Sequence, residues 1–226
     1  MAKKAKKVKQ QPIDELRKVM ARLRASDGCP WDREQDHKSI RLNAVEEVYE
    51  LVDAIEADSE EGMLEELGDL LLQVVFHAQM AEERGVFNFD QITRAITDKL
   101  IRRHPHVFGD AKVEDVEGVW NQWEVIKQAE KAGKTNERKS VFDGIPRHLP
   151  ALMRAHEMVK KGRKQGLMSK GHRTYGKRQI GEELFRLTKK AQANGWEAEA
   201  LLRAETRRQE KALRKKEKSG QRVIHT

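Results

Sequence analysis

Apolar residues in the first half of the chain recur every three or four positions, the spacing that one face of an α-helix requires. These stripes predict helices from Pro12 to Leu23, from a cap at Ser39 to Ile55, from Met63 to Gly85, from Asp90 to Arg103 and over residues 113–131. The connections between them are short, and short connections join helices that pack antiparallel in a bundle. Strand-like alternation of apolar and polar residues is not sustained anywhere. We therefore expect an all-α fold.

The second half of the chain is less regular. Helices are predicted from Leu149 to Met158, over residues 179–193 and from Trp196 to Glu217. Residues 160–178 carry eight Lys and Arg residues, several glycines and no acidic residue. This composition favours a loop or disorder over a packed helix.

The composition limits the class of protein. With 226 residues, 38% hydrophobic and 5% aromatic, the chain can bury one or two modest cores built mainly from aliphatic side chains. No apolar run approaches the roughly 18 residues of a membrane span, and no apolar segment follows the basic N-terminus as in a secretory signal. The single cysteine, Cys29, excludes an intramolecular disulfide. We expect a cytoplasmic protein with no membrane partner.

The net charge of +8 conceals a division along the chain. Residues 11–110 hold 12 Lys and Arg against 22 Asp and Glu, whereas residues 111–226 hold 28 against 15. Such a division indicates two units with different roles. Carboxylates concentrated in one unit also suggest a site for a hard cation, which prefers oxygen ligands.

Two groups of acids have the spacing of such a site. Glu46 and Glu47 precede Glu50 by one helical turn, and Glu66 and Asp69 repeat that spacing on the next predicted helix. If the two helices pack antiparallel, the groups meet between them, and Mg²⁺ is the natural ion to offset their repulsion. We expect Gly68 to let the helices approach closely. The spacing alone is also consistent with acids that form a solvent-exposed helix face and bind no metal.

The sequence around these acids resembles a known family. EExxE followed by ExxD is the signature of the MazG nucleoside triphosphate pyrophosphohydrolases. Further blocks also resemble that family, in order: GCPWDREQ (28–35), ELGDLLLQVVFHAQMA (66–81), KLIRRHPHVFGD (99–110) and WEVIK (123–127). The resemblance is nearly continuous over residues 13–131.

The resemblance implies an all-α, MazG-like helical bundle that uses Mg²⁺, with Mn²⁺ as a substitute, to convert a nucleoside triphosphate and water to a monophosphate and pyrophosphate. The implied metal ligands are Glu47, Glu50, Glu66 and Asp69. The implied catalytic acids, among which no single base is assigned, are Glu46, Glu47 and Glu50. The implied substrate-binding residues are Lys99, Arg102, Arg103, Trp123 and Lys127. The resemblance also implies a homodimer or a higher homo-oligomer.

Several of these residues have a simpler interpretation. The basic residues near position 100 also suit the C-terminal end of a helix, whose dipole favours cations. Trp123 also suits a hydrophobic core. We expect the segment with His104 and His106 to be a structural turn in which Val107 and Phe108 are buried. A catalytic pair of histidines is the less favoured interpretation.

Longer members of the family carry two copies of the domain, and this chain departs from that pattern. Asp143-Gly144-Ile145-Pro146 resembles the junction before the second copy, but no second EExxE or ExxD follows. We expect these parts: a basic disordered tail (1–11), a catalytic domain (12–132), a linker (133–147), a degenerate second helical domain (148–218) and a tail (219–226). The alternative function is an inactive scaffold whose basic C-terminal half binds nucleic acid or acidic proteins.

Overall fold

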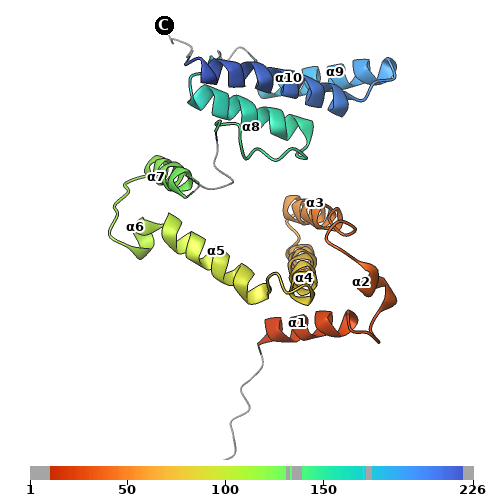
Figure 1. Ribbon diagram of the computed structural model, residues 1–226. Coiled ribbons are helices and arrows are strands. Elements are labelled where there is room, and N and C mark those ends of the chain that lie inside the picture. The colour runs from red at the N-terminus through yellow and green to blue at the C-terminus, as the bar shows by residue number, and fades with distance from the viewer. Residues whose placement is uncertain (1–10, 131–132, 134–138, 170, 172–174, 221–226) are drawn as a thin grey trace, which may run out of the picture. The chain divides into compact units, whose positions relative to one another are not determined.

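The computed structural model describes residues 11–130, 133, 139–169, 171 and 175–220. These residues form ten helices and no strand, which confirms the all-α prediction (Figure 1). The helices are α1 (Pro12–Leu23), α2 (Pro30–Glu34), α3 (Asn43–Glu56), α4 (Glu60–Glu83), α5 (Phe89–Arg103), α6 (Pro105–Phe108), α7 (Val116–Ala129), α8 (Ala151–Lys164), α9 (Lys177–Ala193) and α10 (Ala198–Lys218). None of the helices in the described ranges is long and apolar enough to cross a membrane.

The chain divides into two compact units, Met1–Asp115 and Val116–Thr226. The predicted helix over residues 113–131 was expected in the first domain, whereas α7 belongs to the second unit. The first ten residues of the predicted N-terminal tail, part of the predicted linker and most of the predicted C-terminal tail lie outside the described residues.

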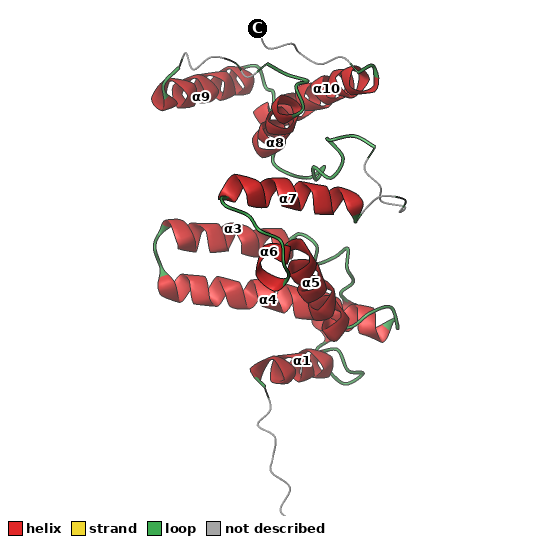
Figure 2. Cartoon of the chain, turned by 90° about the vertical axis from the view of Figure 1, so that its left-hand side faces the viewer, coloured by secondary structure: helices red, strands yellow, loops and turns green. Residues whose placement is uncertain are grey.

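The first unit is organised around the hairpin of α3 and α4, which run antiparallel side by side (Figure 2). The turn between them is tight because Asp58 adopts a left-handed conformation, with φ of 51°. Ser59 then starts α4, its hydroxyl accepting a hydrogen bond from the backbone N–H of Gly62 at 3.1 Å. This turn sets how the residues of α3 align with those of α4.

A small core fixes the C-terminal half of α4. Val75, Phe76 and Met80 of α4 are buried together with Met20 of α1 and Ile40 of the loop before α3. The far end of α1 is also held by charge, since Arg24 donates to the Glu83 carboxylate at 2.8 Å. The guanidinium of Arg24 keeps the pKa of Glu83 below its usual value.

The predicted cap at Ser39 is wrong, because α3 begins at Asn43. The Ser39 hydroxyl instead accepts from the backbone N–H of Asp36 at 2.9 Å, and the Asp36 carboxylate accepts from the backbone N–H groups of Lys38 and Ser39 at 2.7 Å each. These hydrogen bonds close a turn before α3. The Ser39 hydroxyl is engaged within this turn and does not cap the helix.

Two short or exposed segments also differ from expectation. The Pro30–Glu34 helix was not predicted, although a proline at its first position is a helix-start signal. His104–Phe108 forms one helical turn rather than a buried turn, and Val107 and Phe108 are 64% and 61% exposed. This single turn packs against the end of α5 and is too short to cover both side chains.

The second unit has its own core, in which α10 packs against α8 and, less extensively, against α9. Phe142 and Ile145 are buried there with Met158, Leu167 and Leu213. Residues 139–147, assigned to a linker from the sequence, therefore form part of this unit. Their burial was not evident because the segment contains no helical period.

The segment predicted as irregular over residues 160–178 is partly helical. α8 continues to Lys164, with Lys161, Arg163 and Lys164 in a last turn where the helix dipole favours cations. Gly162 does not break the helix but lets Met168 fold back against it, since a Cβ at Gly162 would lie 3.0 Å from the Met168 sulfur.

A pair of histidines joins the loop before α3 to α4. The Nδ1 atoms of His37 and His77 lie 2.7 Å apart, and their rings stack with centroids 5.0 Å apart. Nη2 of Arg84 lies 2.7 Å from Nε2 of His37. Because arginine only donates, His37 Nε2 accepts and its Nδ1–H donates to a neutral His77. Burial, and then the neighbouring His37, lower the pKa of His77.

We expect the first unit to lose stability on acidification from about pH 7.5 to about pH 5.5 through this pair, because unfolded histidine takes up a proton that folded His77 resists. Denaturant unfolding at both pH values measures the effect. His77→Gln, whose amide oxygen still accepts from His37, should show a smaller loss than the wild type. An equal loss in the variant would show that other groups cause the pH dependence.

Candidate functional site

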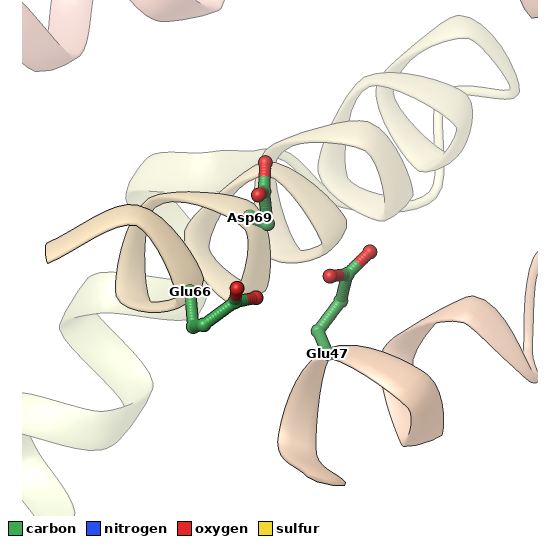
Figure 3. Close-up of side chains that lie close together, drawn as sticks. All are labelled: Glu47, Glu66 and Asp69. Atoms are coloured by element: carbon green, nitrogen blue, oxygen red, sulfur yellow. The ribbon is translucent and has the colours of Figure 1, made fainter. Parts of the chain in front are cut away.

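Three carboxylates converge between α3 and α4 (Figure 3). Glu47 comes from α3, and Glu66 and Asp69 come from α4; one oxygen of each lies within 4.8 Å of one oxygen of the others. All three side chains are partly buried. The described residues contain no other such group of potential ligands.

The local sequence explains this geometry. Glu66 and Asp69 are one turn apart and so share a face of α4, and the hairpin turn at Asp58 and Ser59 brings Glu47 opposite them. Gly68 does not contribute as expected: apart from its own helix backbone and chain neighbours, no atom of the described residues lies within 4 Å of the position that its Cβ would take. The hairpin register, and not a small residue, brings the acids together.

The crowding of the acids changes their ionisation. Partial desolvation raises the pKa of Glu50 even though the side chain is exposed, and the charges of Glu66, Glu47 and Glu46 raise it further. Burial also raises the pKa of Glu66, with added repulsion from Glu65, Asp69 and Glu47. A bound cation would offset this repulsion, and a set of oxygen donors alone suits Mg²⁺.

Gln73, which the sequence motifs do not single out, supports this group. Gln73 is buried, and its Nε2 donates to the Glu47 carboxylate at 3.2 Å. Its amide oxygen is also buried and has no hydrogen-bond partner within the described residues. The signal in the sequence is its spacing, four residues after Asp69 and seven after Glu66, which places all three on one face of α4.

The structure thus brings together three of the four predicted metal ligands. Glu50, the fourth, is exposed and lies outside the group of three, but it is near enough to interact with Glu47 and Glu66. Glu46 is also exposed on α3. The roles assigned to these acids from the sequence remain predictions.

The predicted phosphate-binding residues of the first unit lie in the second half of α5, which extends from the C-terminal end of α4 (Figure 1). Lys99 and Arg103 are partly buried and Arg102 is exposed. Their position in the last turns of α5 also satisfies the helix dipole. Their role in substrate binding therefore remains a prediction.

The remaining two predicted substrate-binding residues are on α7, in the second unit. The rings of Trp123 and Trp120 meet edge to face, with centroids 5.4 Å apart. Lys127 forms an ion pair with Glu124 one turn earlier on the same helix. The stacking and phosphate-binding roles of Trp123 and Lys127 are not tested by these contacts.

Fold and site together define a helical protein in which three carboxylates gather between two antiparallel helices. Residues 35–108 match the family model of the MazG nucleotide pyrophosphohydrolase domain. The chain belongs to the MazG family.

Three relatives illustrate the extent of the similarity. The chain is 51% identical to the nucleoside triphosphate pyrophosphohydrolase of Escherichia coli strain K12 over 150 residues, which is 66% of this chain and 56% of the relative. It is 45% identical to the nucleoside triphosphate pyrophosphohydrolase/pyrophosphatase MazG of Thermotoga maritima over 146 residues, 65% of this chain and 54% of the relative. It is 39% identical to an uncharacterized 26.1 kDa protein of Streptomyces cacaoi over 188 residues, 82% of this chain and 74% of the relative. The chain thus spans about half the length of the first two proteins.

We expect Gln73→Leu to weaken Mn²⁺ binding by about tenfold, because the amide that orients Glu47 is lost while all the carboxylates remain. Electron paramagnetic resonance of free Mn²⁺ measures the affinity, and circular dichroism checks the helix content. Unchanged affinity in a folded variant would show that Gln73 does not orient the cation ligand.

Proposed function

We propose that this chain hydrolyses nucleoside triphosphates to nucleoside monophosphates and pyrophosphate in the presence of Mg²⁺. The observation that carries the proposal is the convergence of Glu47, Glu66 and Asp69 within 4.8 Å between two helices. The names of the Escherichia coli and Thermotoga maritima relatives support the same reaction.

In this proposal Glu47, Glu66 and Asp69 hold the ion, Gln73 orients Glu47, and Glu50 completes the negative environment. When bound there, Mg²⁺ would supply positive charge next to the phosphates and would lower the pKa of a bound water. Mn²⁺ accepts the same oxygen ligands and substitutes for Mg²⁺.

A proton must leave the attacking water, and Glu46, Glu47 and Glu50 are the candidates to accept it. The raised pKa of Glu50, caused by partial desolvation and by its acidic neighbours, makes this carboxylate a stronger base than an isolated glutamate. Lys99, Arg102 and Arg103 of α5 neutralise the triphosphate. These cations stabilise the charge that develops on the departing pyrophosphate.

We expect the double substitution Glu66→Gln/Asp69→Asn to reduce pyrophosphate release by at least about 100-fold. The substitution removes the negative charge of two proposed metal ligands but keeps the size and shape of both side chains. Release is measured over a panel of nucleoside triphosphates with Mg²⁺, with Mn²⁺ and with EDTA. The matched control is Asp53→Asn/Glu61→Gln, which makes the same changes at exposed positions of α3 and α4.

Equal loss in the control would assign the effect to helix stability. No release from any nucleotide by the wild-type chain would contradict the proposal and favour the inactive scaffold.

We also propose that two copies associate through the α3–α4 hairpin. Both helices expose an apolar stripe, formed by Val45, Val48, Tyr49, Val52 and Ile55 on α3 and by Leu64, Leu67, Leu71 and Val74 on α4. Between 38% and 76% of each of these residues is exposed. Monomeric proteins rarely expose such a patch, and two helical hairpins that pack together bury it in a four-helix arrangement.

We expect Leu64→Lys/Leu67→Lys to convert a dimer into a monomer, because two buried charges oppose association. Analytical ultracentrifugation gives the mass of each form. Val19→Lys is the control, since Val19 is an exposed apolar residue of α1 outside the hairpin. A wild-type monomer, or a variant that remains dimeric, would contradict this interface.

A further inference from the structure

The second unit contains a strongly basic pocket that the proposed hydrolysis does not use. The pocket has a volume of about 550 Å³ and lies against α8, α10 and the loop before α8. Four arginines, three lysines and one glutamate line it. The glutamate, Glu210, is thus the single negative charge among eight ionisable side chains.

Two of the arginines are neutralised within the protein. Glu210 accepts from Arg154 at 2.6 Å and from Arg214 at 2.8 Å, and Arg214 also pairs with Asp143 at 2.8 Å. Arg154 is only 7% exposed. Its Nη1 is buried without a hydrogen-bond partner among the described residues. The wall of the pocket therefore includes a fixed guanidinium that is incompletely satisfied.

The other five cations have no ion pair to a carboxylate within the described residues. They are Arg147, Arg207, Lys211, Lys215 and Lys218. The helix dipole accounts for Lys215 and Lys218, which are in the last turn of α10. It does not account for Arg207 and Lys211 in the middle of that helix, or for Arg147 in the loop. Like charges so close together repel one another unless an anion lies between them.

The lining identifies the class of anion. A pocket of this volume suits a small molecule. None of its lining residues is aromatic, so it offers no aromatic side chain on which a nucleobase could stack. Arginine and lysine side chains bind phosphate oxygens by charge-assisted hydrogen bonds. Several cations around one cavity suit several linked phosphates better than a single one.

We propose that this pocket binds a compact phosphate chain, either inorganic pyrophosphate or triphosphate or the phosphate tail of a nucleotide. Binding here requires no divalent ion, because the one carboxylate of the pocket is engaged by two arginines. This distinguishes the pocket from the acidic group of the first unit, where carboxylates need a cation before a phosphate can approach. The proposal does not depend on the proposed hydrolysis.

Isothermal titration calorimetry of the full chain in EDTA tests the pocket, with inorganic pyrophosphate and inorganic triphosphate as probes. Lys211→Gln/Lys215→Gln should weaken binding by roughly tenfold or more, since each lysine supplies one charge-assisted contact. The matched control is Lys189→Gln/Lys216→Gln, which removes the same charge from exposed lysines of α9 and α10 that do not line the pocket. Binding by this control should equal that of the wild type.

The acidic-group variant Glu66→Gln/Asp69→Asn should bind both probes in EDTA as the wild type does. The same variant is expected to lose hydrolysis in Mg²⁺. Unchanged binding in EDTA would therefore show that the basic pocket binds phosphate independently of the acidic group. No binding by the wild type, or equal weakening in the two lysine variants, would overturn the proposal.

Titration with ATP under the same conditions distinguishes the possible sources of the phosphates. Equal affinity for ATP and inorganic triphosphate would support recognition of the phosphate chain alone. Binding of ATP without binding of inorganic triphosphate would overturn it, since the nucleoside would then be required. Pocket-dependent binding of a short single-stranded RNA without binding of inorganic triphosphate would overturn it in favour of nucleic acid.

Discussion

Antiparallel packing of α3 against α4 is the constraint on which the candidate catalytic site depends. Glu47 and the pair Glu66 and Asp69 are separated along the chain, and only the register of this hairpin brings their oxygens within 4.8 Å. Grouping carboxylates in this way is unfavourable because like charges repel, and this repulsion adds to desolvation in raising the pKa of Glu50 and of Glu66. The hairpin must therefore be held by interactions elsewhere, and the core around Phe76 provides them at the other end of α4.

Polar contacts complement that core. Gln73 lies between the buried core and the acids, and its amide transmits the fixed position of α4 to Glu47. One turn further along α4, His77 joins the helix to the loop that precedes α3. Both ends of the segment that carries Glu47 are thus tied to α4, one by the Asp58–Ser59 turn and the other by the histidine pair. This arrangement restricts the freedom of the acidic group.

The two units differ in the sign of charge that they concentrate. The first unit gathers carboxylates, which suit a cation, and the second gathers arginines and lysines around one pocket, which suit an anion. In the second unit, the acidic residues that remain on α9 pair with arginines of the same helix, as Glu182 does with Arg178 and Glu183 with Arg186. Its acids serve mainly to neutralise cations, and most cations of the pocket have no such partner in the part of the chain that the structure describes.

The sequence by itself determined the all-α class, the approximate position of the long helices and the two acidic groups, because helical period and i, i+3 spacing are local properties of the chain. It did not determine that Ser39 closes a turn instead of capping α3, or that Phe142 and Ile145 belong to the second core. Nor did it identify Gln73, whose importance comes from facing Glu47 across the hairpin. These features depend on contacts between residues distant in sequence, and only the tertiary structure decides which side chains meet.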